Sequence, residues 1–321
     1  MKNLKKKKVI VTGCAGFIGS HLCEKLIAKG YYVTGIDNLS NGKINFIKRS
    51  KDNRNFRFFK KDLFKEKKLH KYFKGSEIVF HLAANADVKN GFLQPKKDLE
   101  QNTIVTHNVL EAMRKNLIKK IIFASTGSIY GEPKNFPTKE NHAFPIQTSL
   151  YGSSKLACEG LIQAYCSGFG FNSIILRFVS IMGSRYTHGH LFDFYKQLLN
   201  NKKKLKVLGN GLQKKSYLNI SDCIDAMILT MKKNNKTVEI YNLGTDRFIT
   251  VNHSIKTILK ILNLNPKIYY YGGKRGWVGD SPKIYLDTSK IRKIGWKPKK
   301  TIEESIKETT NFFNKNKWLF K

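Results

Sequence analysis

Two side chains capable of acid–base chemistry, Tyr151 and Lys155, stand four residues apart near the middle of the chain. The surrounding stretch LYGSSKLACEGLIQAY predicts a helix, so both side chains project from one face. An ammonium group close to a phenol favours the phenolate and lowers the tyrosine pKa from its usual value of about 10. We therefore expect Tyr151 to act as a base near neutral pH, tuned by Lys155. The alternative is a helix-surface pair without a joint role.

Two hydroxyl side chains, Ser125 and Thr126, directly follow the apolar run Lys120–Ala124, which predicts a strand. Open α/β sheets bind their ligands at the carboxyl ends of the strands. This position favours one site shared with Tyr151 and Lys155. Because a threonine hydroxyl both donates and accepts hydrogen bonds, Thr126 suits a proton relay or a group that orients a substrate.

A glycine-rich turn near the N-terminus predicts a dinucleotide site. The segment TGCAGFIG, Thr12–Gly19, follows the predicted strand Lys7–Val11 and opens a predicted helix, Phe17–Lys29, which ends at Gly30. Residues without side chains let the backbone approach a pyrophosphate and present amide groups at the positive end of the helix. A turn that is rich in glycine only for packing is the alternative, which the flanking strand and helix disfavour.

An acidic residue, Asp37, follows the second predicted strand, Tyr31–Ile36. A carboxylate there can accept hydrogen bonds from the ribose hydroxyls of an adenosine, and it repels a 2′-phosphate. The next residues, Asn38, Leu39 and Ser40, include no arginine that would bind such a phosphate. The pattern favours NAD over NADP as the cofactor. An aspartate that only caps the next helix is the alternative.

Strand-like and helical segments alternate through the first half of the chain, with further strands expected at Phe56–Phe59, Glu77–Leu82 and Ser173–Phe178. The alternation predicts an α/β fold with a Rossmann-like, doubly wound parallel sheet. After about Ser180 the segments become irregular, which predicts a smaller C-terminal substrate-binding lobe. We expect residues 1–179 to form the NAD-binding domain, with about 217–244 returning to it, and residues 180–321 to form the second domain.

The composition indicates a globular protein of 321 residues, 41% of them apolar, with a formal net charge of +36. Lysine rather than arginine carries the excess charge, which is spread along the whole chain together with abundant asparagine and isoleucine. That joint bias is typical of codon usage in an AT-rich genome, so we expect no specific nucleic-acid partner. A basic nucleic-acid-associated protein is the alternative.

No run of about 20 apolar residues occurs, and no apolar signal segment follows the cluster Lys5–Lys8. We therefore expect a cytoplasmic protein without membrane insertion. No metal is expected either, because the five cysteines lack the spacing of a zinc site; they are Cys14, Cys23, Cys158, Cys166 and Cys223.

Taken together, these features resemble the extended short-chain dehydrogenase/reductase family, in particular its NAD-dependent epimerases and dehydratases of nucleotide sugars. The resemblance runs from about Lys7 to about Glu304. Its motifs are TGCAGFIGSHL at 12–22, DNLSNG at 37–42, DL at 62–63, HLAA at 81–84, ASTGSIYG at 124–131, YGSSK at 151–155, LGNGLQKKSYLNISD at 208–222 and RGWVGD at 275–280. The pattern is most like that of the UDP-glucose (UDP-galactose) 4-epimerases.

The resemblance implies a catalytic set in which Tyr151 is the base, Thr126 relays protons or orients the substrate, and Lys155 also holds the nicotinamide ribose. The implied cofactor-binding residues are Gly13, Ala15, Gly16, Phe17, Ile18, Asp37, Asn38, Asp62, Leu63, Leu82, Ala83, Ala84, Asn102, Ser125, Tyr151 and Lys155. The residues implied for a nucleotide-sugar substrate are Ser125, Thr126, Tyr151, Ser180, Lys215, Arg275 and Asp280.

The second lobe departs from the family pattern at two positions. Ser180 in RFVSIMG replaces the usual asparagine, and Lys215 replaces an arginine, so a point charge stands where the family has a bidentate fork. His188 and His190 lack a third metal ligand, so we interpret them as part of a substrate loop or of the entry to a helix. By resemblance, Ile284 falls near the position that sets room for the C2 substituent of the sugar.

The activity implied is epimerisation at C4 of a nucleoside-diphosphate sugar, such as UDP-glucose and UDP-galactose or their N-acetyl forms, through a transient 4-keto sugar, for surface-polysaccharide or sugar-nucleotide synthesis. Dehydratases of the family carry Asp-Glu where this chain has Gly127 and Ser128, which cannot perform the extra proton transfer. A dehydratase, a decarboxylase, an epimerase acting at another carbon and a non-catalytic NAD-sensing protein remain alternatives. By resemblance we also expect a homodimer, paired through the helices near 98–115 and 149–167.

Overall fold

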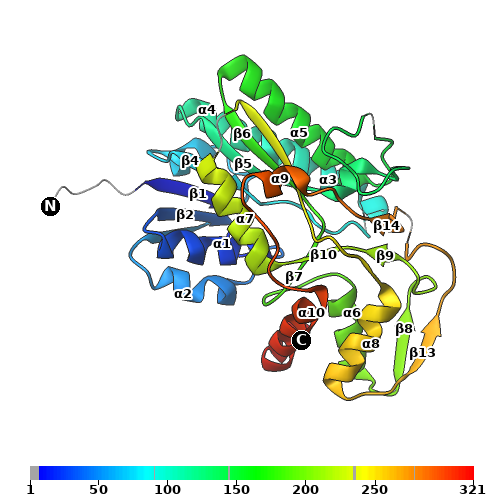
Figure 1. Ribbon diagram of the computed structural model, residues 1–321. Coiled ribbons are helices and arrows are strands. Elements are labelled where there is room, and N and C mark those ends of the chain that lie inside the picture. Colours follow the sequence, from blue (N-terminus) through cyan, green and yellow to red (C-terminus); the bar gives the residue numbers. More distant parts are fainter. Residues whose placement is uncertain (1–6, 90, 144, 234–235, 278) are drawn as a thin grey trace.

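A computed structural model describes residues 7–321, apart from residues 90, 144, 234–235 and 278. At its centre lies a seven-stranded parallel sheet in the order β11-β6-β5-β4-β1-β2-β3 (Figure 1). The strands are β1 (Lys8–Thr12), β2 (Tyr32–Asp37), β3 (Phe56–Lys60), β4 (Ile78–His81), β5 (Lys120–Thr126), β6 (Asn172–Phe178) and β11 (Val238–Leu243). The predicted Rossmann-like sheet is confirmed. Its strand order reverses between β1 and β4, where sheets of this kind bind ligands.

Helices cover both faces of the sheet, which explains why its strands are apolar on both sides. In β1, Val9 and Val11 belong to one buried cluster and Ile10 to another, because successive side chains of a strand point to opposite faces. Three helices lie over the first face, α1 (Phe17–Ala28), α2 (Lys48–Lys51) and α7 (Ile220–Lys233); α4 (Val105–Lys115) and α5 (Leu150–Phe169) lie over the second (Figure 1).

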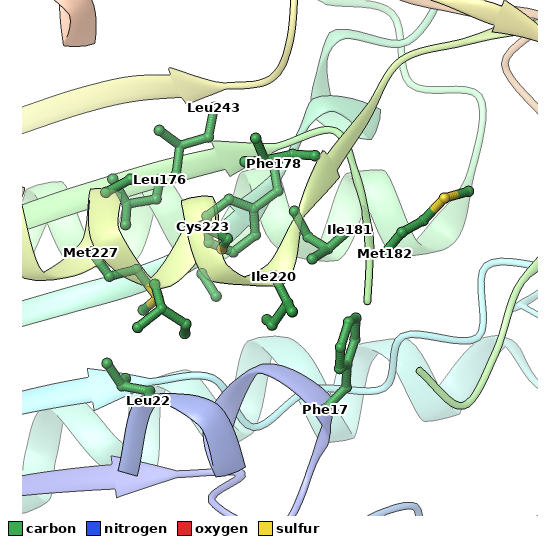
Figure 2. Packing of buried hydrophobic residues seen from close by; sticks show 14 of the residues in the cluster. Phe17, Leu22, Leu176, Phe178, Ile181, Met182, Ile220, Cys223, Met227 and Leu243 are labelled. Atoms are coloured by element: carbon green, nitrogen blue, oxygen red, sulfur yellow. The ribbon is translucent and has the colours of Figure 1, made fainter. Parts of the chain in front are cut away.

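The cluster on the first face joins segments that are far apart in the sequence. Figure 2 shows Phe17 and Leu22 of α1 on one side of the cluster, with Ile220 and Met227 of α7 opposite them. Through this contact, α7 packs against α1 although about 200 residues separate them, and the strand that follows α7, β11, joins the edge of the main sheet.

Short helices connect the strands on the way to α4. The 3-10 helices of the first part are η1 (Ile44–Ile47), η2 (Leu69–Phe73), η3 (Gly91–Leu93) and η5 (Gly127–Tyr130). The helix expected from Asp98 to Lys115 is not continuous: α3 (Pro95–Asp98) leads into a π-helical segment, η4 (Leu99–Ile104), and only then into α4. Such wide turns occur mostly at functional sites.

The part of the chain after β6 builds most of a second lobe. Strands β7 (Ser180–Met182) and β10 (Tyr217–Asn219) pair in parallel beside the main sheet; β8 (Lys204–Val207) pairs with β13 (Lys267–Tyr270); and β9 (Lys214–Lys215) lies between β12 (Ile249–Thr250) and β14 (Lys283–Ile284). The helices are α6 (His190–Asn200), α8 (Val251–Leu262), α9 (Ser289–Lys293), α10 (Ile302–Lys315) and η6 (Lys317–Phe320). A small core, centred on Phe194, Leu205 and Ile255, holds α6, β8 and α8 together.

Among the described residues, no helix combines the length and the apolar character that a membrane crossing requires.

Candidate active site

The glycine turn between β1 and α1 leaves no room for side chains. Gly13 has a φ of 70°, and a Cβ atom on it would lie 2.8 Å from the backbone nitrogen of Ala83. A Cβ atom on Gly19 would collide with the carbonyl oxygen of Gly13. The Gly13 amide donates to the Ile36 carbonyl at 2.8 Å, which fixes the turn against β2. This bare backbone at the start of a helix is a cradle that fits a pyrophosphate.

A cavity lies over this turn at the carboxyl end of the sheet. Of the residues expected to bind the cofactor, it is lined by Gly13, Gly16, Asp37, Asn38, Leu63, Leu82, Ala83 and Ala84. Asp62 stands behind that lining, where its carboxylate accepts a hydrogen bond from Asn38 Nδ2 at 3.1 Å. Seven further residues that were not expected to bind the cofactor also line the cavity: Ile36, Ser40, Asn41, Gly42, Lys61, Gln101 and Val105.

Asp37 lies at the rim of this cavity and is 8% exposed. One carboxylate oxygen accepts the Ala15 amide at 3.0 Å, and the other accepts the Leu39 amide at 2.8 Å. Burial raises the pKa of Asp37, and these two hydrogen bonds oppose that rise. Each oxygen keeps a second lone pair for a hydroxyl donor. The arrangement fits the ribose of an adenosine.

Tyr151 meets Thr126 across the gap between α5 and the end of β5. The Thr126 hydroxyl lies close enough to the phenol to influence its pKa, and Thr126 Oγ1 accepts the Ser128 amide at 3.1 Å. Burial raises the pKa of the Tyr151 phenol, and the Thr126 hydroxyl opposes this rise. The structure thus brings the expected base and the expected relay close together.

Lys155 is 2% exposed, and its Nζ lies 4.2 Å from the centre of the Phe123 ring. Burial lowers its pKa to about 8, against the influence of Cys158 and Glu159. We expected Lys155 to lower the pKa of Tyr151. In the protein chain by itself, however, the effect of burial is larger and the pKa of the phenol is raised. The sequence places both side chains on one helix face, whereas the depth of burial, which disfavours both charged forms, comes from the packing around them.

Ser125 departs from its expected role in substrate binding. It is 3% exposed, and its hydroxyl donates to Glu159 Oε1 at 2.5 Å. Glu159 in turn pairs with Arg177 at 2.7 Å. The side chain of Ser125 is therefore held inside the protein by Glu159 of α5, whereas Thr126, the last residue of β5, lies beside Tyr151.

Asn102 also differs from expectation. It is 1% exposed, accepts the Asn85 amide at 2.7 Å and donates to Ser154 Oγ at 2.8 Å. Its side chain lies behind the cavity, and the preceding residue, Gln101, lines it. The π-helical geometry of η4 sets which side chain faces the cavity, and no pattern in the sequence predicts that geometry.

The residues expected to bind substrate in the second lobe lie close together. Lys215 Nζ lies 2.7 Å from Asp280 Oδ1 in an ion pair with side chains 13% and 4% exposed. Arg275 donates to the backbone oxygen of Asp280 at 2.7 Å and pairs with Glu132 of the first lobe. Ser180 is exposed at the start of β7. Lys215 is thus partly neutralised, which the sequence did not reveal.

Two other residues of this region can be placed. Ile284 packs on the turn after Thr126, because a Cβ atom on Gly127 would lie 3.4 Å from its Cγ2 atom. His190 is hydrogen-bonded to the Tyr217 hydroxyl at 3.3 Å, and burial together with the charge of Lys215 lowers its pKa to about 3. His188 stacks on Tyr186. The two histidines therefore contact aromatic residues of the second lobe.

The parallel sheet of this chain carries a bare glycine turn, the carboxylate of Asp37 and a Tyr/Lys pair at its carboxyl end. These features define a dinucleotide-dependent enzyme of the Rossmann type. The model of the NAD dependent epimerase/dehydratase family matches residues 9–244. The chain belongs to this family, and its cofactor is NAD.

Individual proteins show the same likeness over nearly the whole length. A curated relative from Methanocaldococcus jannaschii, "Putative UDP-glucose 4-epimerase", is 35% identical over 314 residues, 96% of this chain and 99% of the relative. The solved structure of the UDP-glucose 4-epimerase of Thermotoga maritima with UDP-glucose is 33% identical, with a TM-score of 0.86, and covers 96% of this chain and 99% of its own. The UDP-glucuronic acid 4-epimerase of Bacillus cereus, solved with UDP-glucuronic acid and NAD, has a TM-score of 0.88 and 27% identity over 96% and 99% of the two chains.

Proposed function

We propose that this protein inverts the C4 hydroxyl of a nucleoside-diphosphate sugar through a transient 4-keto intermediate, with UDP-glucose and UDP-galactose or their N-acetyl forms as substrates. The observation that carries the proposal is the position of Thr126 beside the Tyr151 phenol at the carboxyl end of β5. The residues after Thr126 are Gly127 and Ser128, which supply no further acid or base. Such a site can move a proton to and from one hydroxyl group and has no means of eliminating water.

The chain's own residues divide the work as follows. The backbone of Gly13 and Gly16 and the carboxylate of Asp37 would hold NAD, which would supply a reversible hydride acceptor for C4. Tyr151 takes the proton of the C4 hydroxyl while Thr126 orients that oxygen. Lys155 holds the nicotinamide ribose. After the 4-keto sugar has turned over in the site, Tyr151 returns the proton to the oxygen at C4, so protons and electrons balance over the cycle.

The second lobe supplies the groups that would hold the nucleotide. Arg275 presents a planar guanidinium group that can bind a diphosphate with two parallel hydrogen bonds. Lys215 adds a point charge, Asp280 can accept a ribose hydroxyl, and Ser180 offers a hydroxyl at the exposed start of β7. Because Asp280 contacts both cations, it sets their position toward the diphosphate.

A panel of UDP-, GDP- and dTDP-sugars tests the proposal. We expect an isomer of unchanged mass, without added cofactor, identified by anomeric NMR, and the Tyr151→Phe variant is expected to lose turnover by about 10² to 10⁴-fold while it keeps NAD. A product that has lost water would indicate a dehydratase, and loss of carbon dioxide a decarboxylase. Bound NAD without any turnover would indicate a sensor, and full activity of Tyr151→Phe would refute the assignment of the base.

We further propose a cytoplasmic homodimer that pairs through α4 and α5. Large apolar side chains are exposed on η4, which leads into α4, and at the end of α5, namely Leu99 (52%), Ile104 (36%) and Phe169 (45%). Apolar side chains exposed on neighbouring helices are typical of protein interfaces. Light scattering after size-exclusion chromatography tests the dimer, and Leu99→Lys combined with Phe169→Lys should yield monomers.

A further inference from the structure

A buried carboxyl group that the proposed reaction does not use lies behind α5. Asp98, the last residue of α3, is 1% exposed. Its Oδ1 accepts hydrogen bonds from Asn85 Nδ2 at 2.8 Å and from Asn102 Nδ2 at 3.3 Å. Its Oδ2 is buried and has no hydrogen-bond partner among the described residues. Burying a carboxylate with one unpaired oxygen costs free energy, so the group needs a functional explanation.

Hydrogen bonds connect Asp98 to the first turns of α5. Asn102 Nδ2, which donates to Asp98, also donates to Ser154 Oγ at 2.8 Å. Ser154 Oγ donates to the backbone oxygen of Tyr151 at 2.8 Å. Two hydrogen bonds therefore separate Asn102 from the residue that bears the phenol.

The other end of this network holds the wall of the cofactor cavity. Asn102 exchanges two hydrogen bonds with the backbone of Asn85: it accepts the amide at 2.7 Å and donates to the carbonyl at 3.3 Å. Asn85 directly follows the lining segment Leu82–Ala84. The π-helical turn of η4 contains Asn102 and ties it to Asp98 four residues earlier, so one buried group supports both the cavity wall and α5.

Asp98 also acts on Tyr151 through its charge. The groups that influence the phenol come from three elements: Asp98 of α3 and Cys158 of α5 raise its pKa further beyond the effect of burial, and Thr126 of β5 lowers it. Around Asp98 itself, burial and the charge of Asp87 raise the carboxyl pKa, while Lys97 and the two amides of Asn85 and Asn102 lower it. A negative Asp98 therefore adds to the effect of burial, in the direction that disfavours the phenolate.

We propose that Asp98 is a positioning residue for Tyr151: its buried carboxylate orders Asn85 and Asn102 behind α5 and places a negative charge beside the helical turn that bears the phenol. The proposal rests on the proposed function, in which Tyr151 first takes and then returns a proton. A negative charge at this point disfavours the phenolate, so ionisation of Tyr151 would then depend on the positive charges of Lys155 and of the bound cofactor.

Three variants of the NAD-bound protein separate charge from structure. Asp98→Asn keeps an oxygen that can accept from both amides and removes the charge. Ser154→Ala breaks the link to α5 and leaves the charge in place. Asp222→Asn is the matched control, because Asp222 is also 1% exposed and accepts two backbone amides, those of Lys299 and Lys300, with one carboxylate oxygen.

Two readouts are followed against pH: kcat, and the ionisation of Tyr151 by NMR of ring-labelled tyrosine, assigned with Tyr151→Phe. For Asp98→Asn we expect both midpoints to fall by about half a pH unit or more, since a like charge is removed, with KM nearly unchanged. Ser154→Ala should lower kcat without moving the midpoint, and Asp222→Asn should change neither readout.

An Asp98→Asn variant whose Tyr151 midpoint stays in place or rises would overturn the proposal, even if its kcat falls, because a purely structural role predicts that result. The NMR midpoint needs no turnover. If the wild-type protein converts no nucleotide sugar, the proposed function fails while the role of Asp98 is still decided by the titration of Tyr151.

Discussion

Replacement of Arg177 by methionine is expected to destabilise the protein strongly. Arg177 and Glu159 form an ion pair whose side chains are only 8% and 1% exposed, with the closest N···O distance at 2.7 Å. The guanidinium group also donates to the Tyr130 hydroxyl at 2.7 Å and to the Glu140 carbonyl at 2.8 Å. Its removal leaves the Glu159 carboxylate buried with Ser125 as its remaining donor.

The size of the effect follows from this geometry. Breaking a buried pair by removing one partner costs about 3 to 5 kcal/mol, because an uncompensated charge stays inside the protein. For a chain of this size, that loss lowers the melting temperature by on the order of 10 °C. The double variant Arg177→Met with Glu159→Leu should recover much of the loss, since an apolar pair of similar volume avoids the desolvation of both charges.

Differential scanning calorimetry and urea unfolding measure the effect, and the chain supplies a matched control. Arg114 and Glu111 form a pair with a similar distance, 2.9 Å, but with side chains 44% and 26% exposed. Arg114→Met should therefore cost only about 0.2 to 0.5 kcal/mol. If Arg177→Met cost no more than this control, or if the double variant were as unstable as the sum of the single ones, the reasoning from burial would be refuted.

Three further predictions concern the cofactor site. Burial lowers the pKa of Lys155 from 10.5 to about 8, so the folded protein binds this proton less tightly than the unfolded chain, and stability rises with pH across that interval. Lys155→Met should therefore stabilise the protein by up to about 3 kcal/mol below pH 8, and this gain should fade at higher pH. Urea unfolding at several pH values measures the gain, and a gain that does not change with pH would show that burial of the charge is not its cause. Gly13→Ala should weaken NAD binding at least about tenfold, because the added Cβ atom would lie 2.8 Å from the Ala83 nitrogen. Gly30 also has a positive φ but has open space around it, so Gly30→Ala should leave the NAD affinity unchanged in calorimetric titration. Asp37→Asn should weaken NAD by about ten- to a hundredfold, as expected for lost hydrogen bonds to a charged group, and should narrow the preference over NADP; an unchanged ratio of the two affinities would show that Asp37 does not select the cofactor.

Several features of this protein follow from short-range patterns and could be predicted from the sequence. The glycine spacing at 13, 16 and 19 predicts the cradle, since only residues without Cβ atoms tolerate the close approach that the structure shows between Gly13 and Ala83. The four-residue spacing of Tyr151 and Lys155 predicts a common helix face, because the helical repeat is the same wherever a helix forms. The alternation of apolar strands and helices predicts the parallel sheet for a similar reason.

Other features were decided only when distant segments packed together. Ser125 turns toward Glu159, 34 residues away, and Asn102 toward Ser154, 52 residues away. Lys215 meets Asp280 across 65 residues of sequence. None of these partners lies within a helical or strand repeat of the residue it contacts, so no local pattern encodes them.

The ionisation of the site belongs to this second group. The sequence determined that a phenol and an ammonium group share a helix face, and this by itself predicted a lowered phenol pKa. The tertiary structure decided that Lys155 is buried and Tyr151 partly buried, with Asp98 behind the phenol, so that desolvation outweighs the neighbouring charge. Spacing along a chain fixes which side chains can meet, whereas the free energy of a charge depends on everything that surrounds it in three dimensions.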